Sequence, residues 1–82
     1  MVLPVTQRAF TERHAAWLRA DAEACAAERD IAAALDRYCE GQGCAPPLAQ
    51  SAAARCLRLR AGEAWGALLA EIDAARRCRP LI

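Results

Sequence analysis

Two long alanine-rich stretches are separated by one segment that cannot be helical, Glu40-Gly41-Gln42-Gly43-Cys44-Ala45-Pro46-Pro47. Two glycines followed by two prolines interrupt helical hydrogen bonding, because glycine favours irregular conformations and proline lacks a backbone donor. The chain therefore turns here. One turn between two helices predicts an all-α fold, an antiparallel helical hairpin.

The first stretch carries an apolar stripe with helical spacing and predicts a helix from about Thr6, a candidate N-cap, to about Glu40. Residues 1–5 read as an extended lead-in. Asp21 and Glu28 interrupt the stripe, which leaves open a break near residues 27–30 and therefore three helices instead of two. The stripe consists of Phe10, His14, Trp17, Leu18, Ala24, Cys25, Ile31, Ala32, Leu35, Tyr38 and Cys39.

The second stretch predicts a helix that begins at Pro46 or Pro47, since proline suits a first helical turn. Its last turn is basic, and Pro80 ends it. A turn centred between Gly43 and Cys44 places Leu18 opposite Leu69 and Cys25 opposite Gly62. The second stripe consists of Leu48, Ala52, Ala53, Cys56, Leu57, Ala61, Ala64, Trp65, Leu68, Leu69 and Ile72, followed by Arg76, Arg77 and Arg79.

Length and composition indicate that this hairpin has little interior. The 82 residues allow one small domain, 1–82, and include 22 alanines but only four aromatic residues. Domains of this size are marginally stable without a disulfide, a metal or a partner chain. We therefore expect the chain to complete its core against another protein or a second copy of itself.

Charge and hydropathy exclude several classes of partner. The net charge is +1, and all 11 basic residues are arginines. A short patch of Arg55, Arg58 and Arg60 has no interleaved aromatic residue, so we expect no nucleic-acid binding. Residues 1–46 hold five arginines and seven acidic residues, whereas residues 47–82 hold six arginines and three. The two predicted helices therefore carry opposite net charges and should attract one another.

The N-terminus lacks the basic and apolar regions of a signal peptide, and no run approaches the ~20 apolar residues of a membrane span. We expect a cytoplasmic protein without membrane binding. A periplasmic or secreted location is the alternative if an export segment was removed.

The five cysteines predict no metal site, because their spacing lacks the paired ligands of zinc motifs. Cys39 and Cys44 flank the turn and could form a disulfide in an oxidising compartment. Alternatively, the cysteines act as small buried hydrophobes. His14 and Cys25 lie about 16 Å apart along one helix, too far for a nucleophilic pair. We predict no enzymatic activity, no cofactor and no small-molecule substrate.

Small residues recur every four positions in the second helix, at Gly62, Gly66 and Ala70. Each mid-helix glycine costs about 1 kcal/mol relative to alanine. The spacing favours either the close approach of another helix or a helix that is loose near Gly62.

The turn Gly41-Gln42-Gly43-Cys44-Ala45-Pro46 and the later Gly62-Glu63-Ala64-Trp65-Gly66-Ala67-Leu68-Leu69 resemble the small bacterial co-chaperones of type III secretion needle subunits. The similar region runs from about Leu18 to Ile72. This resemblance implies a cytosolic helical hairpin without an active site. Such a hairpin would pair with a helical-repeat chaperone and keep the needle protein monomeric before export.

A second resemblance involves Trp17-Leu18-Arg19-Ala20-Asp21-Ala22-Glu23-Ala24-Cys25, together with Ala45-Pro46-Pro47-Leu48 and Arg55-Cys56-Leu57. These segments look like the two cysteine-containing segments of the lysozyme-inhibitor (LprI-like) family. That resemblance would imply an exported inhibitor with a Cys25–Cys56 disulfide. The export signal is missing here, and the arginine expected just before the aspartate is displaced.

The sequence therefore predicts a non-enzymatic protein-binding helical module, either an adaptor or co-chaperone or a homodimer that forms a four-helix coiled-coil bundle. The exported inhibitor is the alternative. Aromatic and large aliphatic side chains dominate the binding energy of such interfaces. The predicted partner-binding residues are Trp17, Leu18, Ile31, Leu57, Trp65, Leu68, Leu69 and Ile72.

Overall fold

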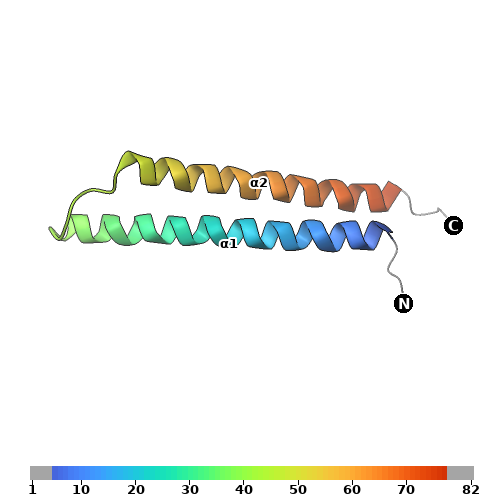
Figure 1. Cartoon of the computed structure of the whole chain (residues 1–82), viewed down its shortest axis with the longest axis horizontal. Coiled ribbons are helices and arrows are strands. Elements are labelled where there is room, and N and C mark those ends of the chain that lie inside the picture. The colour runs from blue at the N-terminus through green and yellow to red at the C-terminus, as the bar shows by residue number, and fades with distance from the viewer. Residues whose placement is uncertain (1–4, 78–82) are drawn as a thin grey trace.

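Two helices form an antiparallel hairpin (Figure 1). The computed structural model describes the chain from Val5 to Arg77, with side chains from Gln7 onward. Helix α1 spans Val5–Cys39 (35 residues) and helix α2 spans Leu48–Arg77 (30 residues). The predicted all-α hairpin is confirmed. The extended lead-in predicted for residues 1–5 and the N-cap predicted at Thr6 are wrong at their described positions, because Val5 and Thr6 already belong to α1. Residues 1–4 and the predicted stop at Arg79 and Pro80 lie outside the described residues.

Helix α1 continues without a break through residues 27–30, so the three-helix alternative is wrong. Most residues in this region are alanine, glutamate or arginine, which are strong helix formers. The two acidic residues that interrupt the stripe, Asp21 and Glu28, do not disturb the helix because both find a partner on α2.

The turn owes its shape to Gly41. The amide of Gln42 donates to the Arg37 carbonyl at 2.7 Å, and the amide of Gly41 donates to the Tyr38 carbonyl at 3.0 Å. These two bonds form a Schellman motif, which requires a left-handed residue just beyond the helix. Gly41 supplies that residue with a φ of 78°, at no steric cost.

Helix α2 begins at Leu48, one or two residues later than predicted. The Pro47 carbonyl accepts the amides of Gln50 and Ser51, so Pro47 caps the helix and does not belong to it. Helix α1 extends beyond the start of α2, and the connecting segment runs back along it (Figure 1). This overhang shifts the register: Cys25 faces Arg58, four residues before the Gly62 that a symmetric turn predicts.

The seam between the helices follows a seven-residue repeat. On α2 the buried residues are Ala54, Ala61 and Leu68. On α1 the fully buried Ala24 has the half-buried Trp17 and Ile31 seven residues before and after it. A seven-residue repeat is typical of helices that coil around each other with a left-handed twist.

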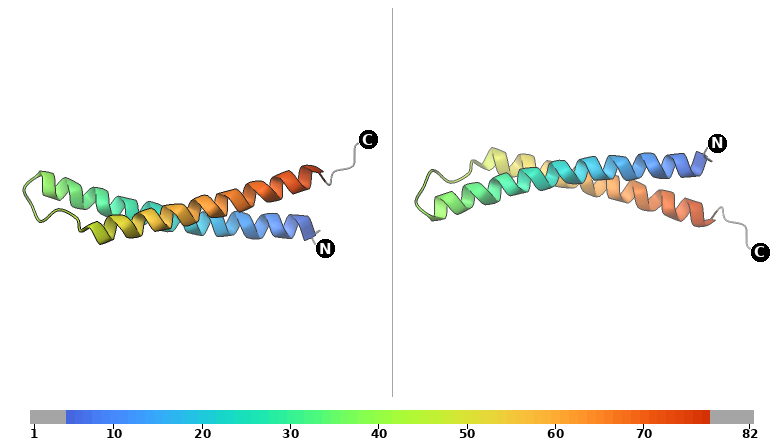
Figure 2. Two further views of the ribbon diagram at one scale, coloured as in Figure 1. Left: turned by 90° about the horizontal axis from the view of Figure 1, so that it is seen from above. Right: turned by 90° about the horizontal axis from the view of Figure 1, so that it is seen from below.

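The helices cross obliquely near their middles and diverge toward both ends (Figure 2). The buried alanines Ala24, Ala54 and Ala61 have only a methyl group, and small side chains allow the helices to approach closely. Larger side chains, among them Trp17 and Leu68, fill the seam closer to the chain ends. Among the described residues no large side chain is fully buried, so this hairpin has a thin core.

Candidate protein-binding surface

The seam divides the hairpin surface into two sides that the contacts of Arg58 and Arg13 identify. Arg58 lies four residues after a buried seam position and pairs with Asp21 and Glu28, each four residues after a seam position of α1. Arg13 and Glu71, each three residues after a seam position, approach to 4.0 Å. Since residues three and four positions onward point to opposite sides of a seam residue, these pairs mark opposite faces.

We name the side that carries Arg58 the aromatic face. It also contains the residues that follow seam positions by one on either helix, because Cys25, directly after Ala24, contacts Arg58. Seven-residue spacing then assigns the other members. Along the paired length of the helices they are Thr11, His14, Leu18, Asp21, Cys25, Glu28, Ala32 and Leu35 of α1, with Leu48, Ser51, Arg55, Arg58, Gly62, Trp65, Leu69, Ile72 and Arg76 of α2.

A group of aromatic rings occupies the half of this face nearer the chain ends. Trp17 packs against Trp65 across the seam, with ring centroids 4.9 Å apart. His14 lies 6.1 Å from Trp17 and stacks on Phe10 at 6.2 Å. Leu18, Trp65 and Leu69 remain 48%, 43% and 45% exposed. The rings therefore hold the helices together and still present a large apolar surface to solvent.

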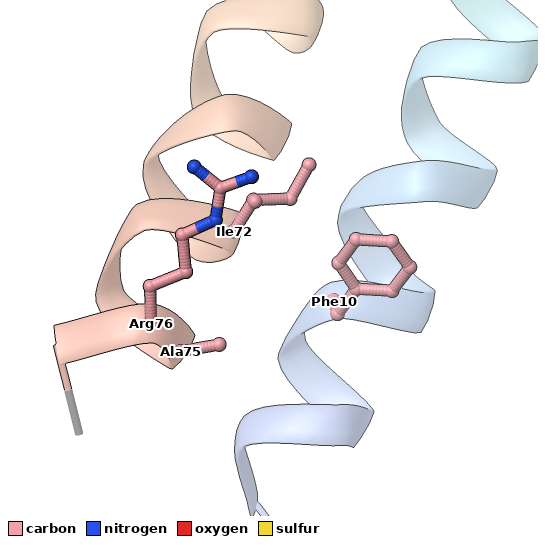
Figure 3. Close-up of a pocket in the computed structure, with 4 residues that line it drawn as sticks. All are labelled: Phe10, Ile72, Ala75 and Arg76. Carbon is pink, nitrogen blue, oxygen red and sulfur yellow. The ribbon is translucent and has the colours of Figure 1, made fainter. Parts of the chain in front are cut away.

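Close to the chain ends the diverging helices leave a groove lined by Phe10, Ile72, Ala75 and Arg76 (Figure 3). Ile72 reaches from α2 toward α1, and the Arg76 side chain lies beside it. The groove is continuous with the aromatic rings, because Phe10 stacks on His14. It lengthens the exposed apolar surface toward the termini.

At the centre of the aromatic face Arg58 binds two carboxylates of α1. Its guanidinium donates to Asp21 Oδ1 at 2.9 Å and to both oxygens of Glu28 at 2.6 and 3.0 Å. The Cys25 thiol completes the cluster, 3.5 Å from Arg58 Nη2 and 3.8 Å from Asp21 Oδ2. These hydrogen bonds lower the pKa of Glu28 and raise the pKa of Arg58.

This cluster contributes more to register than to stability. Its three charged side chains are all partly exposed, and exposed ion pairs contribute about 0–1 kcal/mol. A shift of α2 by one residue would turn Arg58 away from both carboxylates, so the cluster favours one alignment. It also removes Arg58 from the basic patch that the sequence suggested, leaving Arg55 and Arg60 on different sides.

The opposite side, which we name the alanine face, carries small and charged residues. Alanines occupy half of its positions, and Leu57 is its one large apolar side chain among the described residues. Arg13 and Glu71 are its cross-helix charged pair. Its members are Arg13, Ala16, Ala20, Glu23, Ala27, Asp30 and Ala34 of α1, with Gln50, Ala53, Leu57, Arg60, Ala64, Ala67 and Glu71 of α2.

The eight predicted partner-binding residues lie in three places: the seam, the alanine face and the aromatic face. Leu68 is 3% exposed and belongs to the hairpin's own core, and Trp17 and Ile31 are half-buried seam residues. Leu57 is half-buried on the alanine face. Leu18, Trp65, Leu69 and Ile72 lie together on the aromatic face. Leu48 lay on the predicted stripe but was not among the predicted partner-binding residues, although it is 88% exposed at the turn end of the same face together with Leu35.

The thiols of Cys25, Cys39, Cys44 and Cys56 are all free. The disulfide that the sequence allowed between Cys39 and Cys44 is not formed, and both thiols are exposed. The bond implied between Cys25 and Cys56 is also absent: Cys25 is half-buried in the Arg58 cluster, whereas Cys56 is exposed.

Within residues 5–77 no three histidine, cysteine or acidic side chains are grouped closely enough to hold a metal ion. Neither described helix has the length and apolar character needed to span a membrane. Comparisons with protein-family models, curated proteins and solved structures found no match to this chain. The two family resemblances therefore stay predictions.

Proposed function

We propose that this hairpin is a non-enzymatic protein-binding module whose aromatic face is covered by helices of a second chain. The observation that carries the proposal is the contrast between a thin core and an apolar surface. Three of the four buried residues of the described chain are alanines, while Leu18, Trp65 and Leu69 lie about half exposed on one face. Exposed apolar patches rimmed by charge mark protein interaction sites.

The exposed area supports the same proposal. The chain exposes 6628 Å², whereas a compact monomer of 8.8 kDa exposes about 4,800 Å². The difference, roughly 1,800 Å², exceeds the ~800 Å² that each partner buries in an interface of standard size. Covering the aromatic face would give the hairpin the interior that its own two helices do not provide.

Leu69 is the best residue for a test of this proposal. Trp65 packs on Trp17, so its removal would loosen the hairpin as well as the surface. Leu69 lies one position beyond the seam and is exposed, so Leu69→Asp should leave the helices intact and abolish association. Leu59→Asp is the matched control, because Leu59 is 63% exposed and points away from both faces.

The measurement is the retention of any bound chain by affinity-tagged protein, with helix content followed by circular dichroism. We expect Leu69→Asp to lose the bound chain and Leu59→Asp to keep it. Equal retention by both variants would contradict the assignment of the aromatic face as the binding surface.

A further inference from the structure

We infer that the chain covering the aromatic face is a second copy of this chain, with both turns at the same end of a four-helix bundle. The inference rests on the proposed function and adds the identity and orientation of the partner. Its basis is the distribution of charge across the face. Carboxylates lie on the α1 side, at Asp21 and Glu28, and arginines on the α2 side, at Arg55 and Arg58.

Two symmetric arrangements can bring two aromatic faces together. If the two-fold axis runs along the helices, α1 of each copy lies over α2 of the other and the turns meet at one end. If the axis runs across the helices, α1 lies over α1, α2 lies over α2, and the turns are at opposite ends. All neighbouring helices are antiparallel in both arrangements, so charge and shape must distinguish them.

Charge favours the axis along the helices. In that arrangement Glu28 of one copy lies over Arg55 of the other, because these residues occupy the same level of the hairpin in the register fixed by Cys25 and Arg58. With the axis across the helices, the carboxylates of α1 would face carboxylates and the arginines would face arginines. Like charges placed opposite each other across an interface are strongly unfavourable.

The apolar surface is compatible with the same choice. Two apolar patches flank the charged centre: Leu18, Trp65 and Leu69 near the chain ends, and Leu35 with Leu48 near the turn. An axis along the helices brings each patch opposite the same patch of the other copy, because both lie at the same level along the hairpin.

A distance between two labels tests the orientation. Cys39 ends α1 at the turn and is exposed, so it can be the single thiol of a chain whose Cys25, Cys44, Cys56 and Cys78 are replaced by serine. Spin labels on Cys39 should lie within about 30 Å of each other if the turns meet. They should lie about 50 Å apart if the turns are opposed, because a 35-residue helix is about 52 Å long.

Charge reversal in the otherwise unchanged chain provides an independent test. Arg55→Glu should weaken self-association at least 10-fold, because it would place a carboxylate over Glu28 of the other copy. Arg60→Glu, which reverses an exposed arginine on the alanine face, should change association less than 3-fold. With opposed turns, Arg55 would not lie over Glu28, so Arg55→Glu should weaken association no more than Arg60→Glu does.

The outcomes separate this inference from the proposed function. A label distance near 50 Å, or an effect of Arg55→Glu no larger than that of Arg60→Glu, overturns the orientation. A chain that is monomeric at every concentration overturns the homodimer. If such a monomer still retains another protein that Leu69→Asp releases, the binding function stands without self-association. If it retains none, both proposals fail.

Discussion

The two faces of this hairpin are built from the same two helices and differ in what they leave for a partner. The aromatic face combines half-exposed large side chains with a buttressing cluster around Arg58. The alanine face presents methyl groups and scattered charges, with Arg13 and Glu71 at its edge. A helix packed on the alanine face would gain little apolar burial, whereas one packed on the aromatic face would cover Trp65 and its neighbours.

This difference shows how an alanine-rich hairpin can have a specific interaction surface without a large core. Alanine at the seam lets the helices approach closely, and it also fills the alanine face. The few large side chains are therefore free to gather on one side. The turn, the seam and the aromatic face each follow from the placement of a few residues in an otherwise uniform background.

The largest expected effect is the difference in association between a variant with a charge introduced on the aromatic face and a variant with a charge introduced on the alanine face. Leu18→Asp should weaken association at least 100-fold, because it would bury an unpaired carboxylate among apolar side chains. Ala53→Asp on the alanine face should change association less than 3-fold. Sedimentation equilibrium of both variants measures the difference. Similar losses in the two variants would mean that the faces are equivalent.

The next effect concerns the seam that keeps the faces apart. Ala61 is buried at the crossing, so Ala61→Leu should destabilise the hairpin by about 1–3 kcal/mol, as overpacking of a close contact does. Ala70→Leu, at an exposed outward position of the same helix, is the control and should be near neutral. Urea unfolding followed by circular dichroism measures both. An unchanged midpoint for Ala61→Leu would show that the helices are not in close contact.

Replacing the glycines of α2 should have a smaller effect, with opposite consequences for the stability of the hairpin and for its association. A Cβ added at Gly62 or Gly66 meets nothing within 4 Å, so alanine at either position should stabilise the free hairpin by about 0.5–1 kcal/mol. Gly62 lies on the aromatic face and Gly66 points outward. Association should fall only for Gly62→Ala if a partner helix approaches closely there. Thermal unfolding and sedimentation of the two variants separate these effects.

The smallest effect is a pH dependence from the Arg58 cluster. Hydrogen bonds from Arg58 hold the pKa of Glu28 below its ordinary 4.5. A lowered carboxyl pKa contributes stability that is present above the unfolded value and is lost as the pH falls through the folded value. The melting temperature of the native chain should therefore drop below about pH 4.5 by more than that of Glu28→Gln. Parallel curves for the two proteins would contradict the role of this pair.

Sequence patterns predicted the turn and both helices because those features are local. Gly41 ends α1 through its left-handed conformation, and Pro47 marks the start of α2. The register between the two helices could not be predicted from local patterns. It depends on how far the two-proline segment runs back along α1, and no local preference of Gly43 or Pro46 determines that distance.

The assignment of faces was also missed, although its signal is in the sequence. A stripe read at mixed spacings of three and four combined the seam with one side, so Leu68 was grouped with Leu69 although one is buried and the other exposed. The strict seven-residue spacing of Ala54, Ala61 and Leu68 would have separated them. The acidic interruptions Asp21 and Glu28 were a further signal, because an arginine on the facing helix satisfies both.

The molar mass of the chain in solution, measured by light scattering during size-exclusion chromatography over a range of concentrations, tests the central claim most directly. A homodimer predicts twice the chain mass of 8.8 kDa at concentrations where the hairpin is folded. A mass of 8.8 kDa at every concentration, in a chain that unfolds cooperatively by itself, would contradict it.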